Sequence, residues 1–456
     1  MQNVNYTLDN QRKYFDEGNT KEIDFRLEQL KKLKLNIKKN ENKLIRALKK
    51  DLCKSVFESY TTEIGIVYEE INIAIKNLKK WAKPTKVKTP ITNFSAHSYI
   101  YSEPFGVVLI ISPWNYPIQL LLAPLVGAIA AGNCAVLKPS EIAKETECVL
   151  TDMIRDTFDE SYISIVNGGA EVSSELLKEK FDYIFFTGGE KVGKIVMKSA
   201  AEHLTPVTLE LGGKSPCIVD EDADVELSAK RIVWGKFLNA GQTCVAPDYV
   251  LAHKKIKERL LDDIKEYISI FFGDNPKKSP DYGRIINEKN FWRLREYIRD
   301  GRTFVGGDID KEELYIAPTV LDNLGWGDLI MKEEVFGPIL PVMEYDNLND
   351  AIKLLKKKSK PLAMYLFMKD KKKQQLVINS LSFGGGCIND TVMHLVNPYL
   401  PFGGVGSSGV GSYHGKNSFD TFSHKKSILK KSYVIDVEMR YPPYEDKINL
   451  ARRLMK

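Results

Sequence analysis

The chain has 456 residues, which is too long for one ordinary compact domain, so we expect two or three domains. Hydrophobic residues make up 43% and charged residues 28%, the proportions of a folded protein rather than a disordered or fibrous one. The net charge of +6, from 66 basic and 60 acidic residues, is too weak a bias at this length to indicate nucleic-acid binding.

The six cysteines are scattered, with neither the pattern of a disulfide framework nor the spacing of a zinc site, so we expect no metal. Met1 to Thr20 is polar and lacks the apolar segment of a signal peptide. No run approaches the roughly 20 apolar residues of a membrane span. These features predict a reduced, cytoplasmic protein without a membrane anchor. Four cysteines lie in apolar segments and are expected in the core: Cys134, Cys148, Cys217 and Cys387.

The N-terminal part of the chain predicts surface helices followed by a short β segment. Apolar residues at helical spacing, separated by lysines, predict an amphipathic helix or helix pair over residues 23–52, and the same pattern recurs over 61–81. Beyond residue 83, Pro84 and Pro90 interrupt the chain, and residues 98–102 alternate like an edge strand.

From residue 107 onward, short β-rich runs alternate with helical segments. This repetition predicts an α/β fold with parallel sheets covered on both faces. We expect two such domains, joined near Gly212–Gly213. The apolar stretch 118–131 is expected to be a buried helix although it contains Pro124. The predicted strands are 107–111, 135–137, 163–166, 183–186, 207–211, 217–219, 250–252, 319–321, 339–342, 363–367 and 387–389.

Cys244 is the sharpest candidate for a catalytic nucleophile. It closes the stretch 239–244, whose small residues are typical of a loop. A reactive thiol needs exposure and a lowered pKa, whereas structural cysteines are buried among apolar neighbours. On residue type alone, an inert cysteine remains the alternative.

Glu210 lies within the β-rich run 207–211, directly before a double glycine. A carboxylate in a buried strand is costly unless it is paired or used. Desolvation would raise the pKa of such a carboxylate, which suits a general base near neutrality. An internal salt bridge or an edge position is the alternative.

Three further segments follow predicted strands at their carboxyl ends, where α/β sheets bind their ligands. Asn115 offers a neutral amide donor of the type that holds an oxyanion, with a turn-forming role as the alternative. Gly188 and Gly189 open a helix and would let the backbone approach a phosphate. Lys138 and Glu141 could reach one ribose, although the segment is also an ordinary helix start.

Together, these segments resemble the ordered motif set of the aldehyde dehydrogenases, and the resemblance covers nearly the whole chain. The C-terminal segments 401–404, 412–416 and 418–424 resemble the class 3 branch in particular. The segments that carry the resemblance are Pro113-Trp114-Asn115, Lys138-Pro139-Ser140-Glu141, Phe186-Thr187-Gly188-Gly189, Glu210-Leu211-Gly212-Gly213-Lys214, Gly241-Gln242-Thr243-Cys244 and Glu334-Val335-Phe336-Gly337-Pro338.

The resemblance implies a three-part subunit. A Rossmann-like NAD(P)-binding domain would hold residues 1–80 and 104–211, and a catalytic α/β domain would hold residues 212–411. A small β-arm would be built from residues 81–103 and 412–435, followed by a C-terminal tail over 436–456. In the family this arm pairs across a dimer, so we expect a homodimer.

The resemblance also implies a reaction, the NAD(P)-dependent oxidation of a medium- or long-chain aliphatic or aromatic aldehyde to the carboxylic acid. Cys244 would form a thiohemiacetal and then a thioester, Asn115 would hold the oxyanion, and Glu210 would activate water. Glu334 is a rival candidate for the base. NAD is the expected cofactor, with NADP also accepted. The implied cofactor-binding residues are Trp114, Lys138, Glu141, Gly188, Gly189, Val192, Glu334 and Phe336.

Two other classes of function stay open at this point. A cofactor-independent thiol hydrolase would use Cys244 with a histidine, but it leaves the glycine turns unexplained. A catalytically silent protein on the same fold would have lost Cys244 or Glu210, and both are present. For His414 and His424 a structural hydrogen bond is expected.

The substrate is the least defined part of this interpretation. Tyr60, Trp114, Tyr116 and the loop 391–399 could line an apolar tunnel. The stretch 448–455 is short, basic and amphipathic, and it differs from an apolar membrane anchor.

Overall fold

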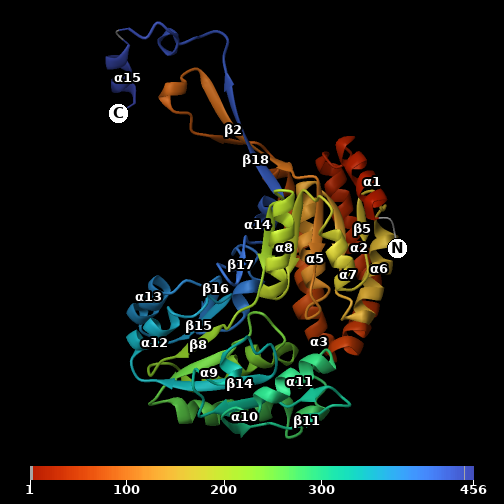
Figure 1. Ribbon diagram of the computed structural model, residues 1–456, viewed down its shortest axis with the longest axis vertical. Helices are drawn as coiled ribbons and strands as arrows, with labels where there is room; N and C mark the ends of the chain where they lie inside the picture. Colours follow the sequence, from red (N-terminus) through yellow and green to blue (C-terminus); the bar gives the residue numbers. More distant parts are fainter. Residues whose placement is uncertain (1–3, 446, 456) are drawn as a thin grey trace.

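A six-stranded sheet forms the core of one half of the molecule (Figure 1). The computed structural model describes residues 4–445 and 447–455; residues 1–3, in the predicted cofactor domain, and 446 and 456, in the predicted tail, lie outside the described residues. Neighbouring strands are parallel except at one edge. The strand order is β17 (Gly409–Val410), β7 (Val207–Glu210), β6 (Tyr183–Thr187), β3 (Val107–Ile111), β4 (Cys134–Lys138) and β5 (Ile163–Ile165).

The direction of winding reverses beside β3. The chain runs outward from β3 through β4 to β5, and it then returns to β6 and β7 on the other side of β3. At such a reversal the loops after the two central strands separate and leave a crevice at their carboxyl ends. The loop after β3 carries Trp114 and Asn115, and the loop after β6 carries Gly188 and Gly189, so the topology brings these two segments to the same edge.

Helix α5 (Gln119–Ala131) is buried along its whole length, as its uniformly apolar sequence predicts. It tolerates Pro124 in its interior and ends at Gly132, whose φ of 95° is the left-handed conformation common after helices. Residues 23–52 form one continuous helix rather than a pair. The other helices of this half are α1 (Val4–Asp16), α2 (Ile23–Leu52), α3 (Val56–Ser59), α4 (Gly65–Trp81), α6 (Lys144–Thr157), α7 (Ala170–Leu176), α8 (Glu190–Glu202) and α14 (Lys416–Thr421).

A seven-stranded sheet forms the core of the other half, and only its edge strand β10 is antiparallel to its neighbour. Its order is β10 (Arg302–Val305), β13 (Thr319–Asp322), β14 (Ile339–Tyr345), β9 (Tyr249–His253), β8 (Pro216–Val219), β15 (Ala363–Phe367) and β16 (Gly385–Ile388). The two-stranded sheet β11 (Ile309–Asp310) and β12 (Tyr315–Ile316) stands beside it. The helices are α9 (Val225–Phe237), α10 (Lys257–Phe272), α11 (Glu288–Tyr297), α12 (Leu348–Leu355) and α13 (Lys371–Ser380).

A three-stranded arm projects from the body and ends near α15 (Ile448–Leu454) (Figure 1). It consists of β1 (Thr85–Val87), β2 (Ala96–Pro104) and β18 (Ser423–Lys431), all antiparallel. The prediction of an edge strand at residues 98–102 is wrong, because β2 is the central strand, paired with β1 on one side and β18 on the other. Its second partner lies more than three hundred residues further along the chain, which the local alternation pattern does not reveal.

Two other expectations need correction. Cys148 is exposed rather than in the core, because it lies on the solvent side of α6, an amphipathic helix. Cys134 and Cys217 are buried, and Cys387 is partly buried. The short strand β17 falls in the range expected for the catalytic domain, yet it pairs with β7 of the other sheet.

Candidate active site

A cavity of about 1090 Å³ opens at the carboxyl ends of β3, β6 and β7 and reaches the second sheet. The first residues of β8 and β9, Pro216 and Tyr249, face it from that sheet. The predicted site residues that the structure brings together on its wall are Trp114, Asn115, Gly188, Gly189, Glu210, Cys244, Glu334 and Phe336.

Cys244 lies on a strained turn after α9. The preceding Asn239 and Ala240 have φ angles of 52° and 50°, which non-glycine residues rarely adopt. Gly241 follows with a φ of 73°, where its own lack of a Cβ avoids a contact with the carbonyl of Gly337. This turn places Cys244, half buried, on the walls of two cavities at once.

The pKa of the Cys244 thiol is raised, not lowered as the sequence suggested. Burial is the main cause, and the nearby carboxylates of Glu334 and Glu210 add to it. The expectation that Cys244 lies on an exposed loop with a lowered pKa is therefore wrong, because small residues permit close packing as readily as exposure. The raised pKa favours the thiol form of Cys244 over the thiolate.

Glu210 ends β7 and is 3% exposed. Both of its carboxylate oxygens are buried and have no hydrogen-bond partner among the described residues. Burial raises the pKa of Glu210 well above that of an ordinary glutamate. The alternative of an internal salt bridge is wrong. An unpartnered buried carboxylate of this kind is typical of a proton acceptor rather than of a structural group.

Glu334 forms a second carboxylate on the same wall. It contacts Gly212 so closely that a Cβ at that position would lie 2.0 Å from its Oε2, which explains the need for glycine there. Burial raises the pKa of Glu334 to about 8, with a smaller contribution from Asp248. Phe336 lies edge-on to Trp114, with ring centroids 5.4 Å apart.

The Asn115 side chain is buried and bridges the two halves of the molecule. Its Nδ2 donates to the carbonyl of Gln242, at 3.0 Å, in the turn that carries Cys244. An amide nitrogen carries two hydrogens, so one remains for a ligand in the cavity. Asn115 and Cys244 thus lie on one wall with a fixed connection between their loops.

Helix α8 begins at the cavity. Gly189 is its N-cap, and a Cβ added there would meet nothing within 4 Å, so the backbone is open on that side. A helix N-terminus with open backbone suits the pyrophosphate of a dinucleotide. Val192, also predicted to contact the cofactor, is 47% exposed and, of the described residues, is not among those lining the cavity.

Lys138 and Glu141 lie together at the end of β4, with Nζ and Oε2 3.4 Å apart. Lys138 is buried and also donates to the carbonyl of Pro139 at 2.6 Å. Neither Lys138 nor Glu141 is among the described residues that line the larger cavity. The sequence therefore predicted their proximity to each other, and their contact with a ribose stays a prediction.

A second cavity, of about 240 Å³, lies on the other side of Cys244 and is lined mainly by apolar side chains. Tyr116 lines it as predicted, but Trp114 lines the larger cavity instead, and Tyr60 is outside the described lining. The loop 391–399 contributes Val392, Met393, Leu395 and Val396.

Sequence reasoning missed two residues of the site. Lys214 pairs with Asp248 at 2.5 Å and donates to the carbonyls of Ile330 and Glu333, so it anchors the loop that carries Glu334. His414 makes the predicted hydrogen bond, 2.8 Å to Glu70, and in addition lines the apolar cavity. Only the motif position of Lys214 hinted at a role.

Comparison with known proteins decides between the functions left open. The model of the aldehyde dehydrogenase family matches residues 1–428. The chain belongs to this family. Two relatives are a 4,4'-diaponeurosporen-aldehyde dehydrogenase of Staphylococcus aureus, 50% identical with 97% of both chains covered, and human aldehyde dehydrogenase family 3 member B1, 48% identical with 96% of this chain and 94% of the relative covered.

Solved structures agree with the family assignment. The substrate-bound state of a Staphylococcus aureus AldH superposes with a TM-score of 0.98 at 49% identity over 100% of both chains. The NAD+ complex of a Bacillus cereus aldehyde dehydrogenase superposes with a TM-score of 0.84 at 26% identity, covering 94% of this chain and 89% of the other. The α/β fold is confirmed, and this aldehyde dehydrogenase oxidises aldehydes to acids with NAD(P). Over the described residues, every helix is too short or too polar to cross a bilayer.

Proposed function

We propose that this aldehyde dehydrogenase acts on apolar aldehydes, medium- or long-chain aliphatic or aromatic, through a covalent intermediate on Cys244. The observation that carries the proposal is the position of Cys244 between the two cavities. The larger one is rich in polar groups and suits the dinucleotide, and the smaller one has an apolar lining that suits a hydrocarbon tail. The name of the Staphylococcus aureus relative, a 4,4'-diaponeurosporen-aldehyde dehydrogenase, is in keeping with this division.

The protein groups divide the chemistry between them. The Cys244 thiol loses its proton to water, and its sulfur then attacks the aldehyde carbon while the carbonyl electrons move to the oxygen, where the second N–H of Asn115 stabilises the charge. Bound in the larger cavity, the nicotinamide supplies the hydride acceptor. Glu210 then takes a proton from a water molecule that attacks the thioester, which releases the carboxylic acid and the thiol. The raised pKa of Glu210 suits this step.

The residues around the larger cavity suit a dinucleotide. We assign the pyrophosphate to the N-terminus of α8 at Gly188 and Gly189, with Val192 in the same turn, and the nicotinamide to the side bearing Glu334 and Phe336, with Trp114 against Phe336. Open backbone at Gly189 supports the first assignment.

Cofactor choice depends on the pair at the end of β4. The Glu141 carboxylate would accept a bond from a 2′-hydroxyl, which favours NAD, and the Lys138 ammonium would pair with a 2′-phosphate. Glu141 is 43% exposed, where a charge pair contributes only about 0–1 kcal/mol. We therefore propose that both cofactors work, with NAD preferred by no more than about a hundredfold in kcat/KM.

A panel of aldehydes of increasing chain length, assayed with NAD and again with NADP, tests the substrate class. We expect kcat/KM to rise with chain length, because each methylene buried in the small cavity contributes about 0.8 kcal/mol. Val396→Trp, which fills that cavity, should remove the gain for long aldehydes and leave a two-carbon aldehyde unaffected. A flat profile that the tryptophan does not change would contradict the proposal.

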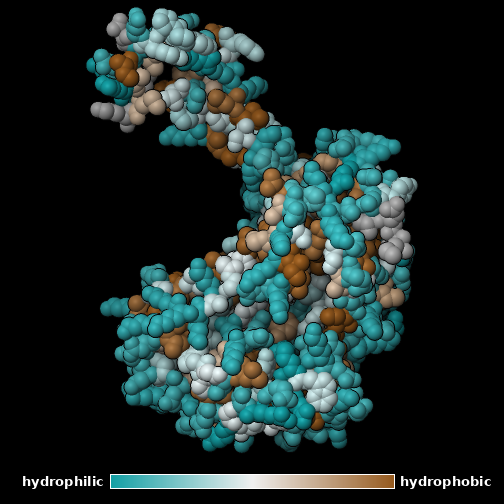
Figure 2. Space-filling model, viewed as in Figure 1, coloured by the Kyte–Doolittle hydropathy of each residue, from teal (hydrophilic) through white to brown (hydrophobic). Residues whose placement is uncertain are grey.

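We propose that the arm pairs two copies of the chain. Over the described part of the chain, strands β1 and β18 form the two edges of the arm, and Figure 2 shows hydrophobic residues along it. Large apolar side chains that are exposed on the arm are Val87, Ile91, Phe94, Tyr101, Ile428 and Leu429. Exposed apolar residues beside free strand edges are suited to burial against a second copy.

Light scattering should therefore report twice the mass of one chain. Replacing Ile428 and Leu429 on β18 by aspartate should shift the protein to a monomer, because charge would be buried in the contact. The same double change at exposed Leu204 and Ile270, outside the arm, is the control. A monomeric native enzyme would overturn the proposal, and a tetramer would argue against a class 3-like assembly.

A further inference from the structure

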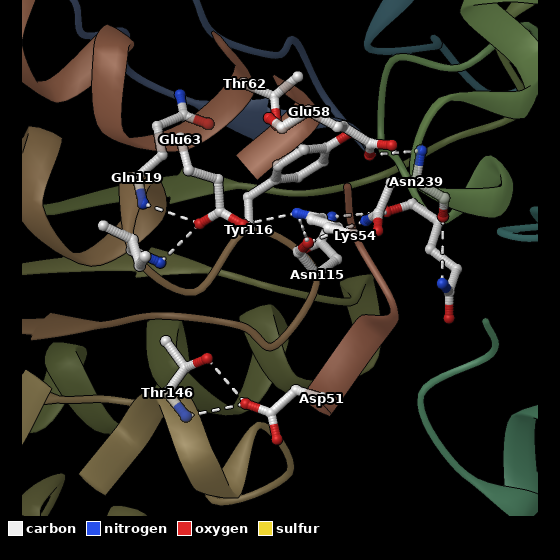
Figure 3. Close-up of polar contacts among 12 residues, drawn as sticks. Asp51, Lys54, Glu58, Thr62, Glu63, Asn115, Tyr116, Gln119, Thr146 and Asn239 are labelled. Atoms are coloured by element: carbon white, nitrogen blue, oxygen red, sulfur yellow. Dashed lines mark hydrogen bonds and ion pairs between the residues drawn. The ribbon is translucent and has the colours of Figure 1, made fainter. Parts of the chain in front are cut away.

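A buried ion pair lies beneath the loop that carries Asn115 (Figure 3). Lys54 and Glu63 both have fully buried side chains, and Nζ lies 2.5 Å from Oε1. Two charges are costly to remove from water, so such a pair is retained only where its geometry is used or is well satisfied by further hydrogen bonds. The proposed chemistry uses neither residue.

The local backbone fixes both members of the pair. Helix α2 stops at Cys53, whose φ of 56° turns the chain so that Lys54 points inward. Just before it, Asp51 accepts bonds from the backbone and hydroxyl of Thr146, at 2.8 and 2.7 Å, which ties this helix end to α6 (Figure 3). Glu63 lies in a single π-helical turn, η1 (Tyr60–Ile64), a rare geometry that is frequent at functional sites.

The Lys54–Glu63 pair holds the loop that carries Asn115 from two sides. The Lys54 ammonium donates to the carbonyl of Asn115 at 3.0 Å and lies 4.0 Å from the ring centroid of Tyr116. The second oxygen of Glu63 accepts from the backbone of Ile118 at 2.8 Å and Gln119 at 3.3 Å, where α5 begins. The segment 115–119 is thus fixed at both ends.

Residues around this ion pair also contact the turn that carries Cys244. Glu58 accepts from the backbone of Asn239 at 2.9 Å, and the Asn239 amide donates to the Asn115 carbonyl at 2.8 Å. The Tyr116 hydroxyl lies 2.6 Å from the Thr243 hydroxyl, next to Cys244. Figure 3 shows Lys54, Glu58 and Glu63 arranged around Asn115, Tyr116 and Asn239.

From these contacts we infer that Lys54 and Glu63 are positioning residues that set the Asn115 amide relative to Cys244, so that it meets the oxygen charge that forms during attack. The inference rests on the proposed role of Asn115. An oxyanion donor acts only when it is already oriented, and small displacements of such a donor cost rate even where substrate binding is unaffected.

Lys54→Met keeps the length of the stem and removes the ammonium. We expect the rate of the first turnover, followed as reduced nicotinamide in stopped flow, to fall by about tenfold or more, as expected for a misplaced oxyanion donor. The affinity for NAD and the rate of Cys244 alkylation by iodoacetamide should stay unchanged, since alkylation forms no oxyanion. The double variant Lys54→Met/Glu63→Gln removes both charges and provides a folded protein if the single change does not.

The control is Lys257→Met, which breaks another buried pair, 2.7 Å to Asp322 at the end of β13, and neither residue is among those lining the larger cavity. It should lower Tm similarly and leave the first turnover unchanged. In an Asn115→Ala background, Lys54→Met should have no further effect, because the group it positions is gone.

Several outcomes would overturn the inference. Equal decreases in the rates of first turnover and of alkylation would mean that the whole turn carrying Cys244 has moved. Additive losses with Asn115→Ala would mean that Lys54 acts elsewhere. Full recovery of the first-turnover rate at high pH would assign the effect to Glu58. Burial raises the pKa of Glu58 to about 7, and the charge of Lys54 acts in the opposite direction. An Asn115→Ala variant with a normal first turnover would remove the role of Asn115 itself, and with it this inference.

Discussion

Cys244→Ser is expected to reduce aldehyde oxidation by about a thousandfold or more, because a serine hydroxyl is a far weaker nucleophile than a thiolate. Binding of NAD should be unchanged, since the substitution alters one atom on the wall of the larger cavity. Steady-state formation of reduced nicotinamide, with cofactor binding followed by calorimetry, measures both quantities.

The exposed Cys148 on α6 supplies a matched control. Cys148→Ser should leave turnover unchanged while removing one site of alkylation by iodoacetamide. Labelling of Cys244 should accelerate as pH rises, because burial and two carboxylates keep the pKa of its thiol raised. Activity that survives in Cys244→Ser would disprove the assignment of the nucleophile.

Glu210→Gln should separate acylation from deacylation. The first equivalent of reduced nicotinamide should still form rapidly, and steady turnover should then fall by about 10²–10⁴-fold, because the thioester has lost its general base. In the native enzyme, deacylation should slow as pH falls, since the raised pKa of Glu210 leaves less carboxylate to accept the proton. Rapid-mixing kinetics over a range of pH measures both effects.

Glu334→Gln is the control for this experiment, because Glu334 lies on the same wall with a pKa raised to about 8. It should weaken cofactor binding without stalling deacylation. If deacylation stops in Glu334→Gln and turnover is normal in Glu210→Gln, then Glu334 is the general base and Glu210 is not. Loss of the rapid phase in Glu210→Gln would instead make Glu210 the activator of Cys244.

The sequence predicted which residues lie together at the cavity better than it predicted their electrostatics. Cys244, Glu210 and Asn115 could be found because each stands in a local segment of distinctive composition. The direction of the Cys244 pKa shift could not, because it depends on burial and on carboxylates that lie about thirty and ninety residues away along the chain. Local composition carries no information about such distant neighbours.

The fold was predictable wherever periodicity was strong. The parallel strands from β3 to β15 and the buried α5 follow from apolar runs of the right length. The two-residue β17 and the central position of β2 were not predictable, since both depend on pairing with distant segments. The Lys54–Glu63 pair was hidden for a related reason, because nothing in the local sequence separates Lys54, just beyond the lysine-rich helix α2, from the many exposed lysines of that helix.

The pairing of β17 with β7 constrains the order in which the protein assembles during synthesis. Glu210 and Leu209 find their strand partners in Gly409 and Val410, which leave the ribosome two hundred residues later. Until then the first sheet has a bare edge beside Glu210, and a bare edge is open to pairing with other chains. Strand β18 completes the arm later still. Strand β7 therefore reaches its final pairing only after about two hundred further residues have been added to the chain.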